Sequence, residues 1–247
     1  MSTPNPGGRE RNRIARTRTF LSTALRIVTD EGFDALTMQR LADECDAAIG
    51  AVYRYFPSKG ALVAEVQKEA IERLASSYQI IRDRSDREFG SIDEADLTLT
   101  RLVLFGRFFC ATADTFPQEL RLLQMLMNEW RAVVPFEEGM RVVPSAMRLL
   151  DRMRVGIDAA VDAGAIEPAD TMARVVTWAA SVSGVLQVSR LDVYDAELFD
   201  GDRLARQLSL DLLVAWGADR SRLEAATARV DALAALGPLA PPVSTDA

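Results

Sequence analysis

The sequence contains no histidine, and this absence excludes several kinds of active site. Serine–histidine–aspartate and cysteine–histidine nucleophile systems, histidine-ligated zinc and histidine–carboxylate di-iron centres all need an imidazole. Only two cysteines occur, Cys45 and Cys110, and they are far apart and form no CxxC pattern. There is also no glycine-rich phosphate loop and no paired-carboxylate motif. We therefore expect free thiols, no metal, no cofactor and no enzymatic activity.

Long apolar runs are absent as well. No stretch approaches the ~18–20 consecutive apolar residues that a membrane span needs. Residues 1–8 are polar and rich in proline and glycine, unlike a secretory signal. Apolar residues make up 49% of the 247 residues and charged residues 26%, as in soluble globular proteins. These features predict a cytoplasmic protein without membrane contact.

Charge is unevenly distributed along the chain. The net charge is −7, which by itself does not favour nucleic-acid binding. The N-terminal end is nevertheless basic, because five arginines precede residue 19: Arg9, Arg11, Arg13, Arg16 and Arg18. This segment is either a solvated tail or an arm that reaches a DNA backbone or minor groove.

The spacing of apolar residues indicates helix nearly everywhere, so we predict an all-α fold. The expected helices cover about 11–31, 37–44, 49–56, 58–84, 94–113, 117–131, 144–163, 169–191, 201–217 and 220–236. Prolines and glycines lie between most of them. We expect disordered tails at 1–10 and 237–247, a helix-turn-helix domain at 11–58, and a ligand-binding and dimerisation domain at 59–236.

Three short helices with a tight connection at residues 45–48 fit a helix-turn-helix. Val52 and Phe56 are four residues apart, so they share one helix face and can pack against Leu41 and Ala42. Ile49, Gly50 and Tyr53 then lie on the opposite face. An α-helix fits the major groove of B-DNA, which is ~12 Å wide. The pattern predicts a reading helix with a buried side and an exposed side.

The stretch from Thr23 to Val66 resembles the DNA-binding domain of TetR-family transcriptional regulators. The matching features are Glu31-Gly32, Leu36-Thr37-Met38, Leu41-Ala42, the run from Gly50 to Phe56, and Ser58-Lys59 with Leu62. The resemblance implies a homodimeric regulator, most simply a repressor, that binds double-stranded operator DNA and is released by a small, apolar effector.

The resemblance also assigns roles to individual residues. Tyr53, Tyr55 and Lys59 match positions that contact phosphates, and Gln39 matches a base-reading position. We further expect apolar base contacts from Ile49 and Ala51, close approach at Gly50, and phosphate contacts from Thr37 and Arg54. Arg40 has Asp43 and Glu44 three and four residues ahead, which predicts a surface ion pair instead.

Two positions in the turn depart from the family pattern. Asp46 stands where a glycine is common, and aspartate tolerates a left-handed backbone. Ala48 stands where serine or threonine is common, and alanine cannot cap the reading helix, which costs ~1 kcal/mol. With Asp43 and Glu44 nearby, these departures leave open whether the turn weakens DNA binding.

The remainder of the chain has no motif of its own. Small residues on 169–191 and a leucine stripe on 201–217 favour a dimer interface containing Ala180, Gly184, Leu204, Leu208, Leu212 and Trp216, although an internal core gives the same pattern. Aromatic and methionine side chains favour a ligand pocket, with ordinary core as the alternative. The pocket candidates are Phe105, Phe108, Phe109, Met125, Asn128, Glu129, Met147 and Trp178.

Two other functions stay open at this point. One is an all-helical interaction module that keeps only a degenerate helix-turn-helix, which Ala48 and the acidic turn would favour. The other is a helical enzyme, which the missing histidine argues against. The helix at 220–236 lies beyond the usual end of the family and has no assigned role.

Overall fold

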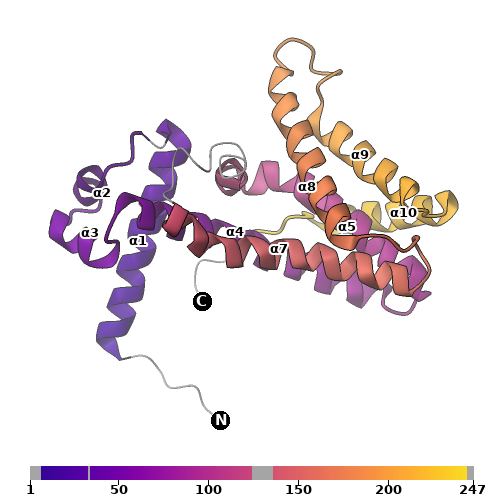
Figure 1. The fold of residues 1–247 in the computed structure, drawn as a ribbon, viewed down its shortest axis with the longest axis horizontal. Helices are drawn as coiled ribbons and strands as arrows, with labels where there is room; N and C mark the ends of the chain where they lie inside the picture. The colour runs from indigo at the N-terminus through magenta and orange to yellow at the C-terminus, as the bar shows by residue number, and fades with distance from the viewer. Residues whose placement is uncertain (1–6, 33, 124–135, 244–247) are drawn as a thin grey trace. The chain divides into compact units, whose positions relative to one another are not determined.

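The computed structural model describes residues 7–32, 34–123 and 136–243, and helix is the only regular secondary structure in these ranges. The predicted all-α fold is confirmed. None of the described helices has the length and apolar character needed to cross a bilayer. The helices in Figure 1 are α1 (Gly8–Glu31), α2 (Met38–Glu44), α3 (Ile49–Tyr55), α4 (Lys59–Phe89), α5 (Glu94–Thr115), α7 (Phe136–Asp162), α8 (Thr171–Val188), the 3₁₀ helix η1 (Ser189–Leu191), α9 (Gly201–Ala215) and α10 (Arg220–Leu236).

The chain folds into two compact units. The first contains residues 1–72 and 118–146, and the second contains residues 73–117 and 147–247. The divisions fall inside α4 and α7, so each of these helices contributes residues to both units. The units therefore differ from the sequence-based division at residues 58 and 59.

A small apolar core holds the first unit together. Phe20 is fully buried, and its ring meets Tyr55 edge-on at 5.4 Å and Phe56 at 6.3 Å, measured between centroids. Edge-to-face aromatic pairs at such distances are favourable beyond the area that they bury. The same core includes Leu41, Ala42 and Val52, as the sequence predicted, and it also includes Leu122 from the helical residues 117–123.

The turn between α2 and α3 has the left-handed geometry that the sequence allowed. Asp46 has φ +46° and is the sole non-glycine residue with positive φ in the described ranges. Arg16 of α1 supports this turn, because its Nη2 donates to the carbonyl oxygens of Cys45 at 3.2 Å and Asp46 at 3.4 Å. The side chain of Ala48 makes no capping hydrogen bond with α3, as expected.

Several helix boundaries differ from the predicted ones. α4 continues to Phe89, through residues that their polarity assigned to a loop, and Ser85 within this extension is fully buried. α7 starts at Phe136 and contains Pro144, where the sequence favoured a helix start. An interior proline costs ~3 kcal/mol. Burial on both sides of it, at Val142 and Leu149, favours continuing the helix.

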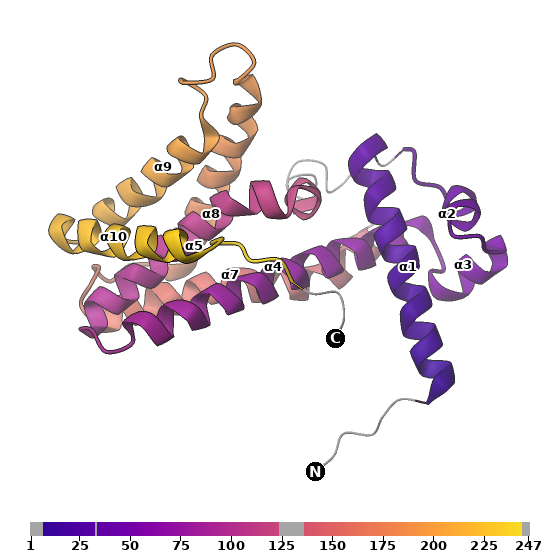
Figure 2. The same cartoon turned by 180° about the vertical axis from the view of Figure 1, so that it is seen from behind.

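In the second unit, α5 is packed against both α9 and α10, and α8 is packed against α9 (Figure 2). Ion pairs join α10 to α5: Arg107 Nη1 lies 2.7 Å from Asp231 Oδ1, and Arg222 Nη1 lies 3.0 Å from Asp93 Oδ1, beside the start of α5. Helix α10, to which the sequence assigned no role, is thus part of the packed bundle.

The segment after Gly237 is not the disordered tail that its prolines suggested. Leu239 and Ala240 are buried, with 6% and 0% of their surface exposed. The Ser77 hydroxyl of α4 donates to the Pro241 carbonyl at 2.7 Å. Proline content predicted an irregular backbone correctly, but burial of these side chains fixes the segment against the second unit.

We predict that a variant ending at Gly237 is less stable than the full chain. It loses the burial of Leu239, worth ~1.5–3 kcal/mol, and the Ser77 hydrogen bond, worth ~1 kcal/mol. Thermal unfolding followed by circular dichroism measures the difference. A variant ending at Val243 keeps both contacts and is the control, so equal melting temperatures for the two variants would contradict the assignment.

Candidate functional site

Helix α3 has one buried face and one exposed face. Val52 and Phe56 are 0% and 3% exposed, whereas Ile49 and Tyr53 are 38% and 48% exposed. Gly50 and Arg54 are exposed as well, and Ala51 is half-buried. The two-faced helix that the sequence predicted is confirmed. Its outer face offers a phenol, a guanidinium, an aliphatic group and a glycine at which an added Cβ would meet nothing within 4 Å.

An open groove of about 700 Å³ lies between α1 and α3 and is rich in arginine. It is lined by Asn12, Arg13 and Arg16 of α1 and by Ala51, Arg54 and Tyr55 of α3. Arg16 is held by the turn carbonyls. In the described part of the chain, neither the Arg13 nor the Arg54 guanidinium forms a hydrogen bond or an ion pair. Two uncompensated guanidinium groups therefore face a groove beside the exposed face of α3.

Thr37 and Gln39, the residues at or near the start of α2 that were expected to contact DNA, form hydrogen bonds within the chain. Thr37 is exposed and caps α2, since its side chain accepts a hydrogen bond from the Arg40 backbone N–H at 3.1 Å. Gln39 is exposed, and its Nε2 donates to Asp43 Oδ1 at 2.7 Å. This bond leaves the Gln39 carbonyl oxygen available. Asp43 is therefore the partner of Gln39 and not of Arg40.

Arg40 fixes α2 to the end of α1. Its guanidinium bonds both oxygens of Glu31, at 2.5 and 2.8 Å, and its Nε lies 3.0 Å from Glu44 Oε1. Arg26 of α1 also pairs with Glu44. The hydrogen bond from Arg40 lowers the pKa of Glu31 below its ordinary value. The predicted surface ion pair of Arg40 is confirmed for Glu44, and Glu31 is a partner that local spacing did not indicate.

Tyr55 and Lys59 are less accessible than the resemblance implied. Both are half-buried. The Tyr55 ring packs on Phe20, and the residue also lines the groove. Lys59 is the first residue of α4. Of the expected phosphate-binding side chains, Tyr53 and Arg54 are thus the most exposed.

The aromatic residues suggested for a ligand pocket form a packed cluster in the second unit. Phe105 and Phe108 are buried and stack around Tyr78 at 4.9 and 5.2 Å, while Trp178 lies 5.1 Å from Phe105. Phe109 is half-buried, 5.4 Å from Trp178. Met147 is 44% exposed, and Met125, Asn128 and Glu129 lie outside the described residues. These contacts are those of a core.

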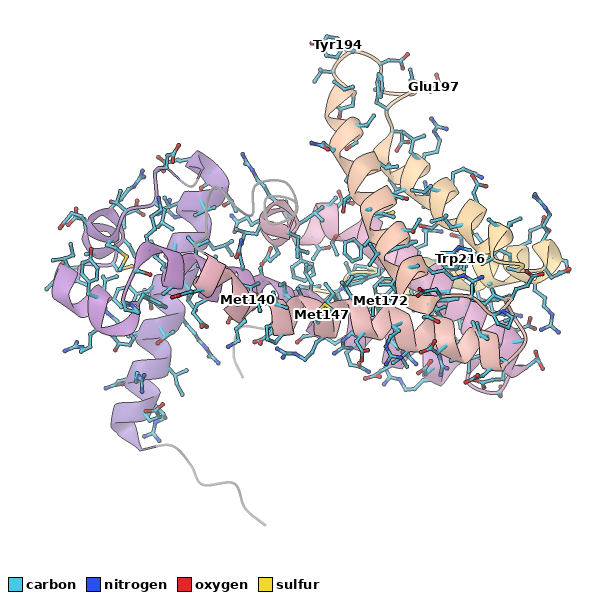
Figure 3. The ribbon with its side chains drawn as sticks, in the orientation of Figure 1. Met140, Met147, Met172, Tyr194, Glu197 and Trp216 are labelled. Atoms are coloured by element: carbon cyan, nitrogen blue, oxygen red, sulfur yellow. The ribbon has the colours of Figure 1, made fainter. Side chains whose placement is uncertain are left out.

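The residues suggested for a dimer interface include a continuous exposed row on α8. Ala180 and Gly184 are exposed, and the same spacing of four brings Met172, Val176 and Val188 into line with them. Leu204, Leu208 and Leu212 of α9 are half-buried. Trp216 differs, because it is buried with the Arg174 guanidinium 5.2 Å from its ring centroid. Figure 3 shows it at the end of α9 far from the α8–α9 loop.

Comparison with known proteins identifies a family and a curated relative that part of this chain resembles. The family model described as bacterial regulatory proteins, tetR family, matches residues 20–66, the segment that carries α2 and α3. This segment of the chain is therefore similar to TetR-family regulators. Among curated relatives, the transcriptional repressor KstR of Mycolicibacterium smegmatis is 37% identical over 67 residues. These cover 27% of this chain and 32% of KstR, so the match spans about a third of the relative.

Solved structures of other proteins share the fold over most of the chain. A transcriptional regulator from Saccharomonospora viridis in complex with choline has a TM-score of 0.58 at 19% identity, covering 83% of this chain and 99% of that one. AibR in complex with isovaleryl coenzyme A and operator DNA has a TM-score of 0.51 at 18% identity, covering 70% of this chain and 86% of AibR.

We predict that Ala48→Ser stabilises the first unit, because a serine hydroxyl can accept a hydrogen bond from an N–H in the first turn of α3, whereas the alanine side chain makes no capping hydrogen bond. The expected gain is ~1 kcal/mol. The control is Ala228→Ser, which adds a hydroxyl to an exposed position inside α10 and caps nothing. Urea unfolding compares the two variants. A gain no larger for Ala48→Ser than for the control would contradict this account of the α3 start.

Proposed function

We propose that this chain is a ligand-responsive transcriptional repressor that binds operator DNA as a homodimer. The observation that supports it most is the exposed face of α3 beside the arginine-lined groove. Tyr53 projects from the helix that would enter the major groove, and Arg13 and Arg54 have no carboxylate partner in the described ranges. Phosphate contacts position such a helix, and side chains at its surface read base edges.

The charge distribution supports DNA as the partner despite the net charge of −7. Among the described residues, three arginines and no carboxylate line the groove. A phosphate backbone following this groove would replace solvent around Arg13 and Arg54 without breaking an existing ion pair. Binding through such contacts releases counterions, so it weakens with salt. AibR, which shares the fold and was solved in complex with operator DNA, supports the same use of this architecture.

The second unit supports the effector part of the proposal. One structure with this fold is a complex with choline and another is a complex with isovaleryl coenzyme A, so the fold accepts ligands of opposite charge. Helix α4 contributes residues 59–72 to the first unit and 73–89 to the second. A ligand that prefers one arrangement of α4 would shift the population of DNA-competent molecules. A tenfold loss of affinity needs only ~1.4 kcal/mol of differential binding.

The exposed row on α8 supports a homodimer. Met172, Val176 and Val188 are 37%, 54% and 44% exposed, and the small residues Ala180 and Gly184 between them allow another helix to come close. An added Cβ at Gly184 meets nothing within 4 Å, so packing inside this chain does not require the glycine. A second copy is the occupant that we propose. Two heads on successive half-sites give an affinity that one seven-residue helix lacks.

We predict that Tyr53→Ala weakens operator binding by at least about tenfold, since it removes a hydroxyl and a ring from the centre of the reading face. Fluorescence anisotropy with labelled DNA from upstream of the coding region, over a salt series, measures the affinity. Tyr53→Phe separates the hydroxyl from the ring. Tyr194→Ala, at an even more exposed tyrosine of the second unit, is the matched control. Equal operator affinities for Tyr53→Ala and Tyr194→Ala would contradict the assignment of α3 to the DNA interface.

We predict that Val176→Arg separates the dimer, because it places a charge in the middle of the apolar row on α8. Leu236→Arg is the control, since Leu236 of α10 is also exposed, at 67%, and lies outside the row. Sedimentation velocity over a range of protein concentrations distinguishes monomer from dimer. A Val176→Arg protein that sediments as the parent does would locate the interface elsewhere.

A further inference from the structure

The second unit contains a cavity of about 530 Å³ that none of the roles above uses. It lies where α5, α8, α9 and the C-terminal segment meet, and all its lining residues belong to the second unit. Its volume is within the range of small-molecule sites, ~300–1,000 Å³. The wall contains a half-buried phenyl ring, Phe199, and the aliphatic side chains of Leu186 and Leu239. An apolar body of moderate size fits this wall.

The charged groups around the cavity are mostly acidic. Among the described side chains, Asp114, Asp192, Asp200 and Asp202 line it, against a single cation, Arg107. Arg107 is already paired with Asp231, with 2.7 Å between Nη1 and Oδ1. Asp202 is paired with Arg206 at 2.8 Å. Among the residues whose side chains the structure describes, no ion pair compensates Asp114 or Asp192.

The helix ends around the cavity favour positive charge independently of these carboxylates. The last turns of α5 and α8 contribute Asp114 and Leu186, and neither helix has a basic residue in its last turn. The carbonyl end of a helix attracts cations. The N-terminal end of α9, which would attract negative charge, also borders the cavity. It is already capped, because the Asp200 carboxylate accepts a hydrogen bond from the Arg203 N–H at 3.0 Å.

Cys110 and Ser189 are uncharged polar residues of the wall. Cys110 is buried, and burial, reinforced by the charge of Asp202, raises the pKa of its thiol to about 12. The thiol therefore stays protonated at neutral pH and does not add a charge. A neighbouring cavity of about 250 Å³ shares Arg107 but is lined by Arg203 and Arg206 as well, so it differs in sign from the larger one.

We infer that the larger cavity binds an organic cation: an amine or quaternary ammonium group held by Asp114, Asp192 and the helix ends, with an apolar body against Phe199, Leu186 and Leu239. Aromatic faces such as Phe199 attract ammonium groups. Only one part of the inference rests on the proposed function, namely that the bound cation is the effector that releases DNA. Binding itself is independent of DNA.

The α8–α9 loop could transmit ligand binding in the cavity to the proposed dimer interface. Asp192 and Phe199 both belong to the segment that joins η1 to α9, and Figure 3 shows Tyr194 and Glu197 of this segment at the outer end of the two helices. A ligand that binds these residues would fix the loop at the end of the α8 row proposed for dimerisation.

Isothermal titration calorimetry on the full chain without DNA tests the inference. We expect saturable binding of choline and of benzyltrimethylammonium. The neutral carbon isostere of choline, 3,3-dimethylbutan-1-ol, should bind at least about tenfold more weakly, because it lacks only the charge. Equal binding of choline and its isostere, or no binding of either cation, would overturn the inference.

Variants locate the site. Asp114→Asn and Asp192→Asn each remove one charge at nearly constant shape and should weaken benzyltrimethylammonium binding about fivefold. Ala111→Phe fills the cavity and should abolish binding. Asp162→Asn, at an exposed aspartate at the end of α7 outside the cavity, is the control and should change nothing. Unchanged binding in the double aspartate variant or in Ala111→Phe, with melting temperatures intact, would overturn the assignment.

A separate measurement distinguishes this inference from the proposed function. Benzyltrimethylammonium should lower the operator affinity of the parent chain and should not affect the Asp114→Asn/Asp192→Asn double variant. If the chain binds the cation but no DNA, the proposed function fails and the cation site stands. If it binds DNA but no cation, the proposed function stands and the cation site fails.

Discussion

The burial of Val52 and Phe56 in the core of the first unit is the constraint on which the candidate DNA interface depends. These two side chains fix the rotation of α3 about its axis, and that rotation decides which residues face outward. The left-handed backbone at Asp46 fixes where α3 begins, and Arg16 bonds the carbonyls of the same turn. A seven-residue helix is too short to be stable alone, so packing and turn geometry together determine what it presents.

Charges without partners connect the two functional proposals. Several arginines of the described residues are paired with carboxylates, and Arg40 with Glu31 and Glu44 is an example. Among the described side chains, guanidinium groups without such partners face the groove between α1 and α3, and carboxylates without an ion pair face the cavity beside α5 and α8. Exposed ion pairs contribute little to stability, so leaving these groups unpaired costs the fold little and leaves them available to bind.

The sequence was most informative where a local pattern determines the structure. The spacing of Val52 and Phe56 predicted both faces of α3, and the identities of Asp46 and Ala48 predicted the turn and the missing cap. It was less informative where distant residues decide. Pro144 suggested a helix start, but burial beyond it continues α7, and the prolines after Gly237 suggested disorder, but Ser77 and the second unit hold that segment. The acidic cavity brings together residues from 107 to 239, and no spacing rule could have indicated it.

The presence of Leu122 in the core of the first unit has a consequence for protein engineering. Leu122 is 1% exposed among residues of α1 to α4, and Arg121 beside it donates to the Thr29 carbonyl at the end of α1. The core of the helix-turn-helix region, residues 20–70, therefore also needs a side chain that lies about fifty positions further along the chain. Chimeric regulators made by exchanging only the first 58 residues would combine a head from one parent with a Leu122 and an Arg121 from another, and a good junction would have to transfer both segments together.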